Sequence, residues 1–94
     1  MVIKMLELNE EIKLLISDFR ENECIRAFFH KLRSLKDDIR ISISEELFKK
    51  FDVEYKCVYY EHLYGDNDAD TLHVVNDCIE VLNAIIATTS RSIC

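Results

Sequence analysis

Three groups of side chains between residues 57 and 80 have the composition of a metal or proton-transfer site. In the first group, Asp66, Asp68 and Asp70 occupy positions 1, 3 and 5 of a calcium-binding loop. Position 6 is then Thr71, where that loop requires glycine, and position 12 is Asp77, where it requires a bidentate glutamate. The segment therefore predicts a solvated acidic loop that caps a helix, without calcium.

The second group pairs Cys57 with His62 and His73 with Cys78, and zinc accepts both kinds of ligand. Five residues along a helix turn two side chains about 140° apart, so this spacing does not help them to share one ion. The third group is His73 with Asp77, one helical turn apart, which has the composition of a general base. No nucleophile motif and no glycine-rich phosphate loop accompanies it. We therefore expect no metal, no cofactor and no enzyme activity.

The negative charge of the chain is confined to its second half. Residues 1–51 carry ten acids and ten Lys or Arg, whereas residues 52–94 carry eight acids against Lys56 and Arg91, which accounts for the net charge of −6. The acids are interleaved with four tyrosines, Tyr55, Tyr59, Tyr60 and Tyr64. Such a surface attracts a basic partner and repels a nucleic acid backbone. We therefore expect a protein that binds a basic protein and does not bind nucleic acid.

Two of these tyrosines are the strongest candidates for a binding role. On a helix whose apolar seam is centred near Phe51, Tyr60 and Tyr64 project away from the seam. Tyrosine is enriched in binding hot spots because it brings a large contact area at a small entropy cost. A bend in this helix is the alternative, since it would let the rings pack on another helix or subunit. The candidate partner-binding residues are Glu54, Tyr60, Glu61, Tyr64, Asp66, Asp68 and Asp70.

The chain lacks the residues on which strands and their turns depend. It has no proline and a single glycine, Gly65. Helices need no such turns, and 94 residues with 49% hydrophobic content suffice for one folded domain spanning 1–94. We therefore expect an all-α protein, folded as a compact antiparallel four-helix bundle.

The apolar periodicity predicts helices over about 3–20, from after Asn22 to Leu35, 45–64 and 71–87, with a frayed tail at 88–94. Asn9 is an alternative N-cap for the first helix. A polar break at 37–38 is expected to precede an extended link at 39–43. The third helix is expected to begin at a cap formed by Ser42 or Ser44.

Gly65 is expected to end the third helix, and Asp68 or Asp70 to cap the fourth. No apolar run of membrane-spanning length occurs, and we read no signal peptide, so a cytoplasmic location is expected. In that reducing compartment the four cysteines are expected to be free thiols, with Cys24 and Cys78 as small core residues. The free protein is expected to be a monomer or a weak dimer.

Several segments resemble a known family. The run Ser44–Phe48, the acidic residues 66–68 and the apolar pattern from Leu72 to Leu82 resemble the C-terminal half of helical bacteriocin immunity proteins of the colicin D type. The segment 58–60, with its paired tyrosines, and the acidic residues after Gly65 are similar to the DNase-colicin immunity proteins. Both resemblances imply a small acidic four-helix protein that binds and blocks a cationic nuclease toxin domain.

For a tRNase-like target, the resemblance implies that a carboxylate array enters the phosphate-binding cleft as a substrate mimic. Glu61, Asp66, Asp68 and Asp70 would meet the cleft, with Tyr60 and Tyr64 as anchors. Two further hypotheses stay open. One is an acidic viral or phage inhibitor of a host factor, and the other is a helical adaptor that associates with itself.

Overall fold

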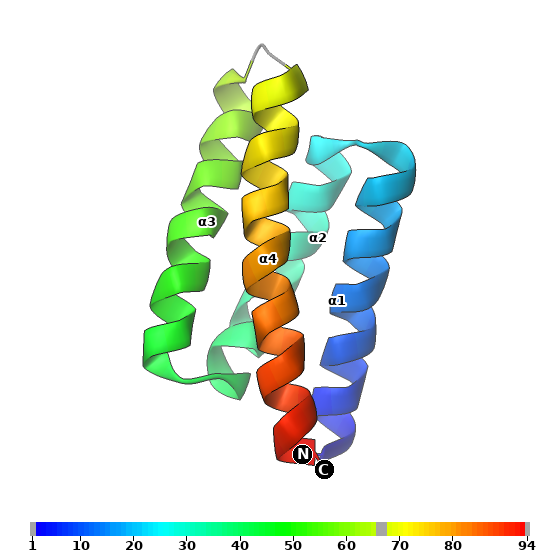
Figure 1. Cartoon of the computed structure of the whole chain (residues 1–94), viewed down its shortest axis with the longest axis vertical. Helices are drawn as coiled ribbons and strands as arrows, with labels where there is room; N and C mark the ends of the chain where they lie inside the picture. Colours follow the sequence, from blue (N-terminus) through cyan, green and yellow to red (C-terminus); the bar gives the residue numbers. More distant parts are fainter. Residues whose placement is uncertain (1, 66–67, 94) are drawn as a thin grey trace.

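The computed structural model describes residues 2–65 and 68–93, and the side chains of residues 7–65 and 70–90. Within these ranges the chain forms four helices and no strand: α1 (Val2–Asn22), α2 (Ile25–Ser42), α3 (Glu45–Tyr64) and α4 (Asp68–Ile93). Each helix runs opposite to the one before it, and the beginning of α1 and the end of α4 lie at the same end of the bundle (Figure 1). The predicted all-α four-helix bundle is confirmed.

The core is built from apolar side chains that recur every three or four residues on each helix, so that each helix buries one stripe. The contacts run in a ring, from α1 to α2, α2 to α3, α3 to α4 and α4 back to α1. Helices α1, α2 and α4 each contribute five or more buried side chains, whereas α3 contributes only Phe51 and Val58. Helix α3 therefore presents a larger share of its side chains to solvent than the other helices do.

Helix α2 is longer than the sequence pattern predicts. The polar break at 37–38 and the extended link at 39–43 are wrong, because α2 continues to Ser42. Leu35 and Ile39 lie one turn apart in the core with 6% and 0% of their surfaces exposed. The free energy gained by burying them outweighs the low helix propensity of Asp37 and Asp38 between them. The Ser42 hydroxyl donates to the Asp38 carbonyl oxygen at 2.7 Å, so Ser42 belongs to α2 and does not cap α3.

The ends of α3 agree with the sequence pattern. Ser44 is the N-cap, and its hydroxyl oxygen accepts a hydrogen bond from the Leu47 N–H at 3.2 Å. At the other end the Gly65 N–H donates to the Glu61 carbonyl oxygen at 2.8 Å. A Cβ on Gly65 would lie 2.5 Å from that oxygen, so glycine is needed here for space.

A buried polar contact joins the two ends of the chain. Thr89 and Asn9 are 1% and 3% exposed, and the Thr89 hydroxyl donates to the Asn9 side-chain oxygen at 2.6 Å. The Asn9 amide nitrogen also donates to the Ser90 hydroxyl at 3.3 Å. Asn9 is therefore not an N-cap but an interior residue of α1. In the tail that was expected to fray from residue 88, α4 continues to Ile93 and Thr89 packs against α1, while the side chains of residues 91–94 lie outside the described part of the chain.

Candidate partner-binding face on α3 and α4

Two tyrosine rings stand on the outer side of α3. Tyr60 and Tyr64 are 61% and 72% exposed, and their rings stack with centroids 6.3 Å apart and planes 24° apart. The ring of Tyr59 meets Tyr60 edge-on at 5.9 Å. Helix α3 is not bent inward, so the expectation that Tyr60 and Tyr64 point away from the core is confirmed. Their role in binding stays a prediction.

Glu54 and Glu61 lie on the side of α3 that faces α4. Glu61 is half-buried, and its Oε1 accepts a hydrogen bond from the Thr71 hydroxyl of α4 at 2.9 Å. The pKa of Glu54 is raised above its ordinary value, first by burial and then by the negative charges of Asp77 and Glu80. These interactions place both glutamates at the contact with α4, and Glu54 beside two of its carboxylates.

Helix α4 supplies three described carboxylates to the same side of the bundle. Asp70 directly precedes Thr71, which bonds to Glu61, while Asp77 and Glu80 act on Glu54. His73 is exposed and its Nε2 lies 3.6 Å from the Asp77 carboxylate. Helices α3 and α4 are antiparallel neighbours (Figure 1), and the interactions of Glu54 and Glu61 place carboxylates of both helices along their contact, as an acidic strip.

We name this surface the acid–tyrosine face. It consists of Glu54, Tyr60, Glu61 and Tyr64 of α3 with Asp70, Asp77 and Glu80 of α4. The sequence pattern did not assign Asp77 and Glu80 to the site, although a hairpin pairing of the last two helices would have placed them there. Asp66 lies outside the described residues, and so does the side chain of Asp68. Asp70 lies within α4, which begins at Asp68, so the prediction that Asp70 is the N-cap is wrong.

The candidate metal ligands do not gather at one point. His62 lies on the α2 side of α3, where its ring stacks on Phe29 with centroids 5.2 Å apart. Cys24 and Cys57 are exposed, so the expectation that Cys24 is a core residue is wrong. Cys78 is in the core as expected, where burial and the nearby Glu54 and Cys57 raise the pKa of its thiol to about 12. Among the residues described, no three His, Cys, Asp or Glu side chains converge as a metal site.

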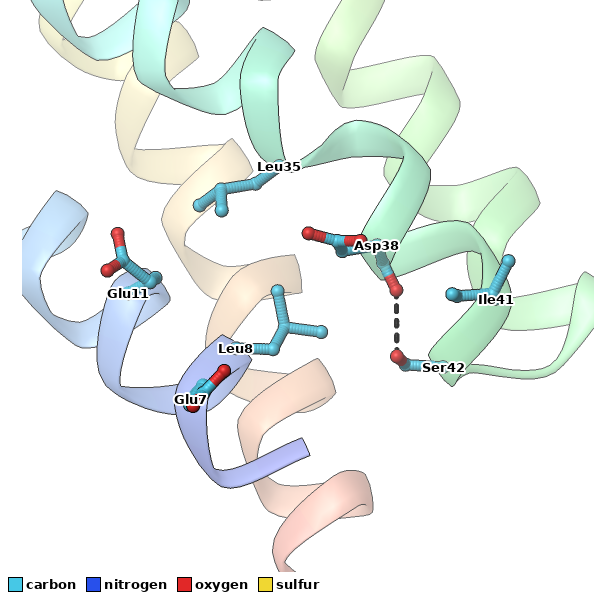
Figure 2. A pocket seen from close by; sticks show the side chains of 7 residues that line it. All are labelled: Glu7, Leu8, Glu11, Leu35, Asp38, Ile41 and Ser42. Carbon is cyan, nitrogen blue, oxygen red and sulfur yellow. Dashed lines mark hydrogen bonds between the residues drawn. The ribbon is translucent and has the colours of Figure 1, made fainter. Parts of the chain in front are cut away.

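A cavity of about 230 Å³ lies between α1 and α2, on the opposite side of the bundle (Figure 2). Glu7, Glu11 and Asp38 surround it, over an apolar floor that includes Leu8. It is smaller than usual ligand pockets, which span ~300–1,000 Å³. One of its carboxylates is already paired, since Glu11 lies 2.5 Å from the Lys31 ammonium group. This cavity therefore offers a weaker site than the acid–tyrosine face.

Comparison of the chain with protein-family models, with curated proteins and with solved structures gave no significant match. In the described part of the chain, none of the helices combines the length and the apolar character that crossing a membrane requires.

Proposed function

We propose that this protein is an inhibitor that binds a basic protein through the acid–tyrosine face, and that the partner is a cationic nuclease toxin domain. The observation that carries the proposal is the exposed, stacked pair Tyr60 and Tyr64 beside the carboxylate strip of α3 and α4. Large rings at a solvent-facing position contribute little to the core, so a contact with another molecule is the best physical reason for them.

The two rings are suited to anchor a partner. Their mutual stacking holds both in place before binding, so that less side-chain freedom is lost on association. Buried at the centre of an interface, a tyrosine of this kind contributes about 2 kcal/mol or more. The carboxylates of the acidic strip then favour a partner whose surface is positively charged.

The electrostatics of the strip favour a cationic ligand. The pKa of Glu54 is raised first by burial and then by the charges of Asp77 and Glu80, so its ionised form carries a cost that is partly repulsion. Lysine or arginine groups brought against this strip relieve that repulsion. A nuclease presents such groups in the cleft that binds phosphate, and opposite fields also accelerate association, as an antitoxin requires. The resemblance to colicin immunity proteins supports the same partner class.

The proposal places the protein in the cytoplasm, where a nuclease toxin meets nucleic acid. The three described cysteines, Cys24, Cys57 and Cys78, are free thiols, which suits a reducing compartment.

The experiment that tests the proposal is capture of partners from cells that express the chain naturally. The baits are the wild-type chain and a Tyr60→Ala/Tyr64→Ala variant, each washed at high salt. We expect a basic nuclease domain on the wild-type bait only, and loss of its activity when the wild-type chain is added. Capture of a host factor without nuclease activity would favour an acidic viral or phage inhibitor, and capture of the chain alone would favour a self-associating adaptor.

Two charge-reversal variants test whether the acidic strip accelerates association with the partner. Asp70→Lys/Glu80→Lys changes two carboxylates of the acid–tyrosine face, and Asp37→Lys/Asp38→Lys makes the same charge change on α2. We expect the first pair alone to slow association with the captured nuclease by about tenfold or more at low salt, and far less at high salt. Equal slowing by both pairs would contradict a localised acidic site.

A further inference from the structure

The other flank of α3 carries a groove with the opposite charge. Along its contact with α2 lie three cations of α2 and three aromatic rings of α3. We name this the cation–aromatic groove, and its members are Arg33, Lys36, Arg40, Phe48, Tyr55 and Tyr59. Two cavities open along it, one of about 270 Å³ that includes Arg33 and Tyr59, and one of about 400 Å³ that includes Arg40 and Phe48. Lys49, Glu45 and Asp52 also line the larger cavity, so the groove as a whole has four cations against two acids and stays net positive.

The cations of the groove are positioned by the rings. The Lys36 ammonium nitrogen lies 4.4 Å from the centre of the Tyr55 ring, and the Arg40 guanidinium lies 5.9 Å from the centre of the Phe48 ring. Burial raises the pKa of the Tyr55 phenol, and the charge of nearby Arg33 acts in the opposite direction, which places Arg33 on the same side of the groove. Two of the three cations, Lys36 and Arg40, therefore have a ring that favours one position for them.

Two of these cations are free to bind an anion. Lys36 is shared with Asp52, whose carboxylate lies 3.7 Å away and also contacts Lys56 at 3.1 Å. Among residues 7–65 and 70–90, neither Arg33 nor Arg40 forms an ion pair. They are seven residues apart on α2, which separates them by about 10 Å along the helix. Side chains on one face of an extended chain recur about every 7 Å, so carboxylates two or four residues apart bracket this separation within the reach of the two arginine side chains.

The chemistry of the groove favours carboxylates over nucleic acid. The rings of Tyr55 and Phe48 already have cations over them, so they are poor platforms for stacking bases. A planar guanidinium group pairs with a carboxylate through two parallel hydrogen bonds, which suits both arginines to acidic side chains.

We propose that the cation–aromatic groove binds an acidic segment of a second protein, through Arg33 and Arg40. The molecule then carries two binding surfaces of opposite charge on the two flanks of α3. One takes a basic partner and the other an acidic one. This inference does not depend on the nuclease, since it rests on the α2 flank alone.

The probe for this site is a labelled oligoglutamate peptide, followed by fluorescence anisotropy at low salt. The test variant is Arg33→Gln/Arg40→Gln. The matched control is Lys13→Gln/Arg20→Gln, which removes the same charge from two exposed residues seven apart on α1. We expect saturable binding by the wild type, about tenfold or more weaker binding by the test variant, and a change within about twofold for the control.

Four outcomes would overturn the proposal. The first is that the wild type does not bind the peptide saturably, and the second is that the test and control variants lose the same affinity. The third is that a labelled oligothymidylate binds more tightly than the peptide. The fourth is that the wild type sediments as a dimer and the test variant as a monomer. The last two would assign the groove to nucleic acid or to a second copy. Circular dichroism checks that the variants fold, and the single change Arg33→Gln, which leaves Arg40 over Phe48, serves if the double variant does not.

Discussion

Thr89→Val tests how much the buried hydrogen bond between Asn9 of α1 and Thr89 of α4 contributes to the stability of the bundle. Valine has nearly the shape of threonine, so the change removes a hydroxyl from a site that is 1% exposed without opening a cavity. The Asn9 side-chain oxygen then loses the donor that lies 2.6 Å away. A buried polar atom left without a partner costs about 1–3 kcal/mol.

The reverse change should cost less. In Asn9→Leu, which keeps the branched side-chain skeleton, the Thr89 hydroxyl still has the Ile85 carbonyl oxygen at 2.9 Å as an acceptor. In the double variant Asn9→Leu/Thr89→Val, neither buried polar atom of the pair remains. We therefore expect the double variant to be more stable than Thr89→Val alone, although it carries one more substitution.

Thermal and urea unfolding followed by circular dichroism measures these differences. In a domain of this size, a loss of about 2 kcal/mol lowers the Tm by roughly 8–16 °C. The control is Ser34→Ala, whose exposed hydroxyl donates to the Lys31 carbonyl oxygen and which should change stability by less than about 0.5 kcal/mol. A Thr89→Val variant as stable as the wild type, or a double variant less stable than Thr89→Val, would refute the reasoning.

Three further predictions concern single residues. Tyr60→Ala should weaken partner binding about 30-fold, the equivalent of about 2 kcal/mol, with little change in Tm. The control is Leu14→Ala, which is also exposed but lies on α1 and should leave the Kd from a binding titration unchanged. Glu54→Gln should stabilise the protein slightly at neutral pH. The pKa of Glu54 is raised in the folded state, so its ionisation at neutral pH costs folding free energy that glutamine does not pay. Urea unfolding at several pH values should show this gain disappearing below pH 4.5, where the carboxyl is protonated in both states. Glu23→Gly should raise stability by about 0.5–1 kcal/mol in the same unfolding assay, because Glu23 has a φ of 51°, where only glycine is unstrained; a loss would contradict this.

Features with a local cause were predictable from the sequence. The bounds of α3 depend on a serine cap at Ser44 and on Gly65, and both act on backbone groups within four residues. The outward direction of Tyr60 and Tyr64 follows from their angular distance to Phe51 on a straight helix. Local signals of this kind do not depend on how the helices later pack.

Features with a distant cause were not predictable in this way. Asn9 looks like a cap until its partner Thr89 is known, and that partner lies 80 residues away. Asp37 and Asp38 look like a break because the sequence alone does not show that Ile39 is buried against other helices. Asp77 lies beside His73 as the helical spacing predicts, but only the pairing of α3 with α4 shows that it is also a neighbour of Glu54.

The most direct test of the central claim is a titration of the captured nuclease domain, with cleavage of its nucleic acid substrate as the readout. We expect one equivalent of the wild-type chain to stop cleavage, and the Tyr60→Ala/Tyr64→Ala variant to require about a hundredfold or more excess. Full inhibition by that variant at one equivalent, or continued cleavage with excess wild-type chain, would contradict an inhibitor that acts through the acid–tyrosine face.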